Sequence, residues 1–225
     1  FREVQERLDR ERASAEILEV ISQSRDDDKP VFDAILKNAS ALCNAQQAAL
    51  ILGTAEDKAQ QLGASHDVAS AAIELFESGE MPMDGDISYA ARSIIEARLV
   101  AFDDMRDSDL YTAGSPVVRS MVDDSSIRSV LFVPLIRGGV AIGNITLFRY
   151  EVNPFSEFEI SLVETFAAQA VIAIENVRQF REVQERLERE QATKEVLSVI
   201  SESRDDEAPI FNAILRQAKE LCEAE

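Results

Sequence analysis

Few residues of this chain are of types that do chemistry. The single histidine, His66, follows an apolar run and could bind a haem or a metal ion. Asp103 and Asp104 follow a second apolar run, where carboxylates could bind a metal ion or accept a phosphoryl group. The chain has no second histidine, and no Lys or Thr at another expected strand end completes an acidic site. We therefore interpret His66 as an ordinary strand-end residue and the two aspartates as a solvated or helix-capping pair.

Three further motifs have structural interpretations. Gly138, Gly139 and Gly143 could cradle a phosphate, but no Gly-Lys-Ser/Thr follows them, so we expect hairpin geometry. The segment 144–146, Asn-Ile-Thr, matches a glycosylation acceptor only formally, because it lies inside an expected strand. Cys43 lies on an apolar helical stripe and is interpreted as a small core residue. The sequence thus indicates no catalytic residue, no metal site and no identifiable cofactor.

Composition restricts the classes of partner. The chain has 225 residues, of which 46% are hydrophobic and 29% charged, enough to bury one substantial core. Its net charge of −19 argues against nucleic acid or an anionic membrane surface as the main partner. We find no signal peptide and no apolar run that approaches a membrane span, and we expect no membrane contact.

The chain is organised around a long helix expected between Pro154 and Ser203. Ser156 and Glu159 form a capping box at its start, and no Gly or Pro follows before Pro209. Apolar residues recur at helical spacing for roughly forty residues, far beyond the usual length of about 11–12. The first half is apolar on a broad face and belongs to a core, whereas the second half is charged with a narrow apolar seam.

The same stretch repeats the start of the chain. Residues 180–187 are identical to residues 1–8, and 28 of 43 positions match when 180–222 is aligned with 1–43. A repeat of this period is domain-sized. We therefore expect one complete unit of a tandem array and the opening of the next. Cys43 and Cys222 occupy equivalent positions, so an intradomain disulfide is not expected and a cytoplasmic location is the default.

These patterns predict four segments. Residues 1–29 form an N-terminal linker helix, 30–178 a sensory domain, 179–207 a C-terminal linker helix that repeats 1–28, and 208–225 the first helix of a next unit. The apolar stripe of the first linker helix is narrow, which favours a two-helix coiled coil. The alternative is a helix folded back on its own domain.

The domain itself mixes helices and strands. We expect strands at 48–52, 60–66 and 99–102, and a hairpin over 129–150 that turns at Gly138-Gly139. Pro134 cannot donate to a ladder and indicates an edge or a bulge. Helices are expected at 68–77 and 88–98, and the long polar stretch 105–124 has room for one helix. Excursions of this kind are often functional loops.

Several runs resemble the closing half of a GAF domain. They are the hairpin Arg128-Ser-Val-Leu-Phe-Val-Pro-Leu-Ile-Arg-Gly-Gly-Val-Ala-Ile-Gly, the Pro154-Phe-Ser-Glu helix start, and Phe166-Ala-Ala-Gln-Ala-Val-Ile-Ala-Ile-Glu-Asn176. The resemblance covers roughly residues 30–178. It implies an α+β fold, an α/β sandwich with an antiparallel sheet of five or six strands, helices on its faces and long flanking helices. It also implies a sensory role in bacterial signalling proteins, in tandem before a histidine kinase or nucleotide cyclase.

Specialised branches of that family are not supported. Bilin-binding members carry a Cys near the pocket, and methionine sulfoxide reductases carry several, whereas the only Cys in this domain is on its first helix. Members that resemble cyclic-nucleotide receptors carry Asn-Lys, but Asn144 is followed by Ile145. The leading hypothesis is a non-catalytic sensor, and an enzyme ranks behind it because no nucleophile and base are paired.

Four polar residues are the predicted ligand contacts. They are Arg106, Tyr111, Arg119 and Arg128, and their arginines favour an anionic or aromatic ligand. We expect the signal to pass through a parallel homodimer formed by residues 1–22 and 163–200, because the seam Val177, Phe180, Val183, Leu187 would otherwise face water. The rival hypothesis is a ligand-free spacer that sets distance and dimer register.

Overall fold

The structure, a computed structural model, describes residues 2–24, 26–68, 73–74, 76 and 78–202. The chain divides into two units, residues 1–177 and 178–225, which we describe separately. The first unit holds the sheet, and the described part of the second is helical. The expected helix at 208–225 lies outside the described residues, as does part of the helix expected at 68–77.

A five-stranded antiparallel sheet forms the centre of the first unit. Its strands lie in the order β2-β1-β5-β4-β3. Their bounds are β1 Gln47–Leu52, β2 Gln61–His66, β3 Val100–Phe102, β4 Ser129–Arg137 and β5 Val140–Arg149. The fold class expected from the sequence, α+β with an antiparallel sheet, is therefore confirmed.

The β4–β5 hairpin follows the sequence signals closely. It turns at Gly138 and Gly139, whose φ angles are +58° and +86°. Residues with a side chain rarely adopt positive φ angles, so glycine is favoured at this turn. The register shifts between Pro134 and Ile136, which confirms a bulge at the proline. Gly143 lies within β5, where an added Cβ would come within 2.3 Å of the Ile51 carbonyl oxygen. The close contact between β5 and β1 therefore requires glycine at this position.

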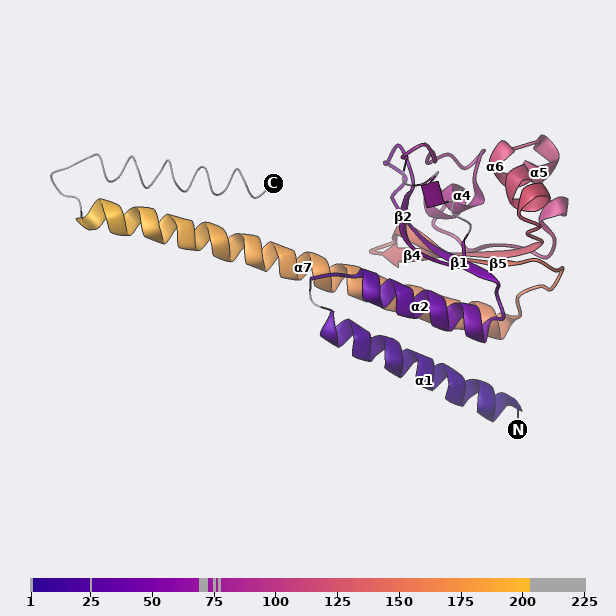
Figure 1. Ribbon diagram of the computed structural model, residues 1–225, viewed down its shortest axis with the longest axis horizontal. Helices are drawn as coiled ribbons and strands as arrows, with labels where there is room; N and C mark the ends of the chain where they lie inside the picture. Colours follow the sequence, from indigo (N-terminus) through magenta and orange to yellow (C-terminus); the bar gives the residue numbers. More distant parts are fainter. Residues whose placement is uncertain (1, 25, 69–72, 75, 77, 203–225) are drawn as a thin grey trace. The chain divides into compact units, whose positions relative to one another are not determined.

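Three helices cover one face of the sheet. They are α1 (Arg2–Gln23), α2 (Lys29–Leu42) and the beginning of α7 (Glu157–Glu202), and Figure 1 shows them together on one side of the strands. Their apolar faces form one cluster with alternate residues of the sheet. Ile35 and Phe166 contribute to this cluster from the helices, and Leu131 and Ile145 contribute from the strands. This cluster is the main core. Its burial is the largest stabilising contribution to the unit.

The capping box expected at the start of α7 is present. The Ser156 main-chain N–H donates to Glu159 Oε2 at 2.8 Å, and the Glu159 N–H donates to Ser156 Oγ at 3.3 Å. From there α7 runs for 46 residues, consistent with the expected length. The helix therefore begins at a defined residue against the sheet.

The first linker helix has one buried face and one exposed face. Ala13, Ile17 and Ile21 of α1 are buried in the main core, so this face packs on the helix's own domain. Arg10 also donates to Thr165 Oγ1 of α7 at 2.7 Å. Leu8 and Leu18 of the same helix are exposed. One face of α1 is therefore folded back on its own domain, as in the sequence alternative, while the coiled coil with a second chain stays a prediction.

Short helical segments cover the opposite face of the sheet. They are α4 (Tyr89–Ile95), η1 (Met105–Asp107), α5 (Asp109–Ala113), α6 (Pro116–Arg119) and the π-helical turn η2 (Ser120–Asp124). Figure 1 shows α4, α5 and α6 on the side away from α1 and α2. The stretch 105–124, expected to hold one helix, therefore holds four short ones. Caps at Ser108 and Ser115 interrupt the run, because each accepts from a main-chain N–H three residues on.

The expectation that no run approaches a membrane span requires a correction. Residues Glu157–Gln191 of α7 contain an 18-residue window of mean hydropathy 1.4, long and apolar enough to cross a membrane by length and composition. Part of this helix is a core element, because Val163, Phe166 and Ala170 are buried against the sheet. One such helix is weak evidence for a span, since core helices have the same composition.

Arg149 joins the sheet to the helical layer. This last residue of β5 is only 3% exposed. Its Nη1 donates to the carbonyl oxygens of Asn153 at 2.7 Å and Pro154 at 3.1 Å, and its Nη2 donates to the Cys43 carbonyl and to Glu159. One guanidinium thus fixes the end of α2, the β5–α7 connection and the first turn of α7.

We predict that Arg149→Met lowers the free energy of unfolding by about 3–5 kcal/mol, because it leaves Glu159 without its cation and three carbonyl groups without a donor. The matched control is Arg137→Met, which removes the more exposed ion pair with Glu175 at 3.0 Å and should cost less than about 1 kcal/mol. Urea unfolding followed by circular dichroism measures both. Equal losses in the two variants would contradict the role assigned to Arg149.

Candidate functional site

A cavity of about 390 Å³ lies between the sheet and the short helices. We call it the inter-layer cavity. The sheet contributes residues that share the face opposite the main core: Gln47, Ala49, Ile51, Leu62, Phe132, Thr146 and Phe148. The covering segments contribute Val68, Phe76, Met81, Ser88, Tyr89, Ala90, Val117, Ser120, Met121, Asp124, Ser125 and Ile127. Its size and mostly apolar lining are those of small-molecule sites.

Aromatic rings line one wall of the cavity. Tyr89 from α4, Phe132 from β4 and Phe148 from β5 form a chain, with ring centroids 6.2 Å apart for the first pair and 6.5 Å for the second. Tyr89 also contacts Phe102 at 4.5 Å. Such tilted and edge-on contacts fix the ring positions. The wall is therefore ordered by its own packing.

Tyr89 is held by a polar network behind this wall. Its hydroxyl donates to Asp109 Oδ1 at 2.5 Å and accepts from the Leu110 N–H at 2.9 Å, and Arg92 Nη1 donates to Asp109 Oδ2 at 2.8 Å. Burial, with the hydrogen bond to Asp109, raises the pKa of Tyr89. Hydrogen bonds from Tyr89 and Arg92 hold the pKa of Asp109 below 3.8. The network joins α4 to α5.

A second polar link ties the sheet to α4. Asn144 is fully buried, and its Nδ2 donates to the Ala90 carbonyl at 2.8 Å. Thr146 Oγ1, in turn, donates to Asn144 Oδ1 at 3.0 Å. Asn144, which matched a glycosylation acceptor only formally, therefore has a structural role beside the cavity.

None of the four residues predicted to bind a ligand lines this cavity. Arg106 is exposed on η1, and the Arg119 guanidinium lies against Gly114. The Tyr111 hydroxyl donates to Asp123 at 3.0 Å, and Arg128 forms a two-point ion pair with Asp104, whose Oδ1 lies 3.0 Å from Nε. The four residues are not gathered around one space, and their contact with a ligand stays a prediction.

The other chemical candidates have structural surroundings. Asp104 accepts from the Arg106 N–H at 3.1 Å and so caps η1, which agrees with the capping interpretation. His66, at the end of β2, lies 3.6 Å from the Asp67 carboxylate. Cys43 is buried in the main core, and burial raises the pKa of its thiol to about 12. Within the described ranges, no three His, Cys, Asp or Glu side chains gather as metal ligands.

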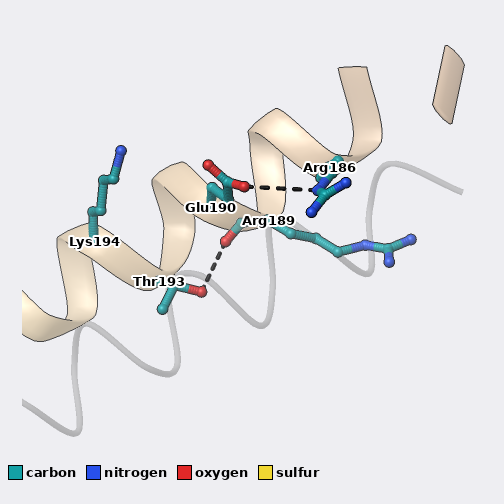
Figure 2. Close-up of a pocket in the computed structure, with 5 residues that line it drawn as sticks. All are labelled: Arg186, Arg189, Glu190, Thr193 and Lys194. Carbon is teal, nitrogen blue, oxygen red and sulfur yellow. Dashed lines mark hydrogen bonds and ion pairs between the residues drawn. The ribbon is translucent and has the colours of Figure 1, made fainter. Parts of the chain in front are cut away.

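Two further hollows do not form candidate sites. Figure 2 shows one on α7, where Arg186 lies 3.8 Å from Glu190 and Thr193 Oγ1 donates to the Arg189 carbonyl at 2.8 Å. All five described lining residues come from this helix and most of them pair along it, so they form a solvated charged surface. The other, of about 320 Å³, lies beside Arg149, whose charge is paired with Glu159.

Sequence reasoning missed the residues that line the cavity because they carry ordinary core signals. Phe132 and Phe148 were assigned to strands, and their side of the sheet was not distinguished from the main core. The period of two along β5 could have separated the faces: Ile145 and Leu147 point to the helical layer, whereas Thr146 and Phe148 line the cavity. Thr146, a polar residue within this mostly apolar strand, was the sequence signal that its side of the sheet differs from the main core.

Comparisons with known proteins agree with this architecture. The sequence profile of the GAF domain matches residues 29–174. No curated protein matches the chain. A similar structure is the GAF domain of a phosphoenolpyruvate-protein phosphotransferase from Coxiella burnetii, with a TM-score of 0.61 and 14% identity over 76% of this chain and 96% of that chain.

Two other similar structures come from different kinds of protein. One is a domain of a two-component sensor histidine kinase protein from Sinorhizobium meliloti 1021, with a TM-score of 0.55 and 18% identity over 69% of this chain and 95% of that chain. The other is free methionine-R-sulfoxide reductase from Neisseria meningitidis, with a TM-score of 0.57 and 13% identity over 72% and 86%. At these identities the likeness shows the fold.

The Asp104–Arg128 pair predicts a pH effect on stability. The hydrogen bond from Arg128 holds the pKa of Asp104 below its ordinary value of 3.8, so the unfolded chain binds the proton more readily. The pair's contribution is complete above about pH 5 and is lost as the pH falls through the lower folded-state pKa. Asp104→Asn should therefore lower the urea midpoint at pH 7 and differ less from the parent at pH 3.

The neighbouring exposed carboxylate supplies the control for this experiment. Asp103→Asn should change the urea midpoint less than Asp104→Asn at pH 7. A deficit in Asp104→Asn that is as large at pH 3 as at pH 7 would show that the carboxylate charge is not what stabilises the contact.

Proposed function

Because the chain belongs to the GAF domain family, we propose that it is a sensory module of a signal-transduction protein and binds a small molecule in the inter-layer cavity. The observation that carries this proposal is the cavity itself, an apolar space of about 390 Å³ on the face of the sheet opposite the main core. GAF domains serve as regulatory modules, and one similar structure comes from a sensor histidine kinase protein.

We propose a binding role without catalysis. The reductase among the similar structures does not transfer its activity, because the described cysteine of this domain, Cys43, lies in the main core and not at the cavity. Its high pKa keeps the thiol protonated at neutral pH. A cytoplasmic location and a place in a tandem array before a kinase or cyclase are parts of the same proposal.

Strand β5 offers a route from the cavity to the helices. Thr146 and Phe148 line the cavity, and Arg149 at the end of the same strand holds the first turn of α7 through Glu159. A ligand that shifts β5 by a fraction of an ångström would change the Arg149 contacts on the other face. We propose this strand as the element that transmits binding to α7.

Binding in the cavity can be tested with a neutral fluorescent probe, 6-propionyl-2-dimethylaminonaphthalene. We expect saturable binding of one probe per chain, with a blue-shifted emission caused by the apolar lining. Ser120→Phe places a ring at a residue that lines the cavity and should weaken binding about tenfold or more. Ala113→Phe, which adds the same ring at an exposed residue of α5 away from the lining, should bind as the parent does.

Two results would contradict cavity binding. The first is emission that rises with probe concentration without saturating, as surface adsorption would give. The second is an equal loss of affinity in Ser120→Phe and Ala113→Phe.

We also propose that the module forms a parallel homodimer through residues 1–22 and 163–200, a role that would serve equally in a ligand-free spacer. Val183 is 64% exposed and Leu187 47% exposed on the charged part of α7. Apolar side chains at these positions form a narrow seam that a second helix would cover. The sensor and the ligand-free spacer differ in whether they bind a ligand, but both would use this dimer interface.

We predict that Leu187→Glu shifts the chain from dimer to monomer at tens of micromolar without unfolding the first unit. Burying each leucine contributes about 1.5–3 kcal/mol to the free energy of dimerisation, and a carboxylate at the seam would remove this contribution. Analytical ultracentrifugation measures the mass, and circular dichroism reports the fold. Gln184→Glu adds the same charge at an exposed polar position and should leave the dimer intact. A monomeric parent chain with intact helices would refute the proposal.

A further inference from the structure

We propose that the ligand of the inter-layer cavity is an aromatic molecule that carries a protonated amine, and not a carboxylate or a phosphate. The inference rests on the proposed function of the cavity as a ligand site and specifies the chemistry of that ligand. It follows from which charges line the cavity, where they lie, and which polar groups are already satisfied.

The inner part of the cavity offers apolar and aromatic surface. Tyr89 is only 2% exposed, and its ring lies in the chain of contacts with Phe132 and Phe148. Two methionines, Met81 and Met121, also line the cavity and add polarizable sulfur atoms. A flat aromatic ligand gains dispersion contacts on such surfaces, and a volume of about 390 Å³ accommodates two fused rings with a short side chain.

The buried polar groups beside these rings already have partners. Thr146 Oγ1 donates to Asn144, and Gln47 Nε2 donates to the Tyr150 hydroxyl at 2.8 Å. Ser88 Oγ accepts from the Ala91 N–H as the cap of α4. A ligand therefore finds few polar groups to satisfy within the cavity, and its own polar group belongs at the rim.

The single charged residue among the described lining residues is Asp124, at the end of η2. It is exposed and follows Ser120 and Met121 of the same turn, with Ser125 next to it. An ammonium group here would meet a carboxylate and hydroxyl oxygens while staying in contact with water. A carboxylate or phosphate at the same place would meet a like charge.

No Lys, Arg or His is among the described residues that line the cavity. The segment 67–80, which includes positions outside the described ranges, also carries none in its sequence. An anionic ligand would thus enter an apolar space without a counter-charge, which is costly. The sequence expectation of an anionic ligand rested on Arg106, Arg119 and Arg128, none of which lines the cavity. The two expectations differ in the charge of the ligand, so a comparison of cationic and anionic probes distinguishes them.

Three probes that share one ring system separate these chemistries. They are 2-(2-naphthyl)ethylamine, 2-(2-naphthyl)ethanol and 2-naphthylacetate, which are cationic, neutral and anionic at pH 7. We expect titration calorimetry on the full 225-residue chain to give the amine about five- to tenfold tighter binding than the alcohol. The carboxylate should bind about tenfold or more weakly than the alcohol. Raising the salt concentration should narrow the difference between amine and alcohol.

Matched variants assign the preference to one carboxylate. Asp124→Asn should reduce amine binding to the level of the alcohol and leave the alcohol unchanged. Asp123→Asn is the control, because Asp123 accepts from the Tyr111 hydroxyl and is not among the lining residues. The alcohol also reports whether each variant is folded, since its binding depends on the cavity and not on the charge.

The outcomes separate this inference from the proposed function. If none of the probes binds, the cavity is not a ligand site for this class of ring and both proposals fail. If the alcohol binds but the carboxylate binds as well as or better than the amine, the cavity remains a site and the amine inference is overturned. An amine preference that survives Asp124→Asn and disappears in Asp123→Asn would also overturn it.

Discussion

The fold depends on one buried cation placed where three elements meet. The Arg149 guanidinium stacks on the Phe155 ring at 3.9 Å and donates to carbonyl groups from the end of α2 and from the β5–α7 connection, while Glu159 balances its charge. The cost of burying this cation is offset by the hydrogen bonds of its two Nη atoms to three carbonyl groups and by the paired charge of Glu159, while its Nε is buried with no partner among the described residues. The geometry of the α7 start is therefore set by the last residue of β5.

Much of this fold could be predicted from the sequence because its signals are local. The capping box at Ser156 and Glu159, the Gly138-Gly139 turn and the apolar helical stripe that ends at Cys43 each depend on a few neighbouring residues, and each was found where expected. The packing of α1 could not be predicted in the same way. Its narrow stripe suits either a partner helix or its own domain, and the choice depends on the α2 and α7 surfaces that Ala13 and Ile17 contact.

The candidate site was less accessible to sequence reasoning for a related reason. Its lining comes from four strands and from the segments that cover them, spread along the chain from Gln47 to Phe148, and no motif unites them. Arginines in the loops were predicted as ligand contacts because of their charge, yet the charge of Arg128 is paired with Asp104. What identifies the cavity is the combination of aromatic side chains on one sheet face with short helices that do not fill the space above them, a property of the packing.

The edges of the sheet carry a consequence for how the molecule meets its neighbours. The two outer strands are β2, which is rich in polar residues and contains Gly63, and β3, which has three residues. Long apolar outer strands can template strand addition and amyloid-like aggregation, whereas short or polar ones resist it. Neither edge offers an extended apolar template, so the sheet does not favour growth from one molecule into the next, even at a high local concentration of these domains.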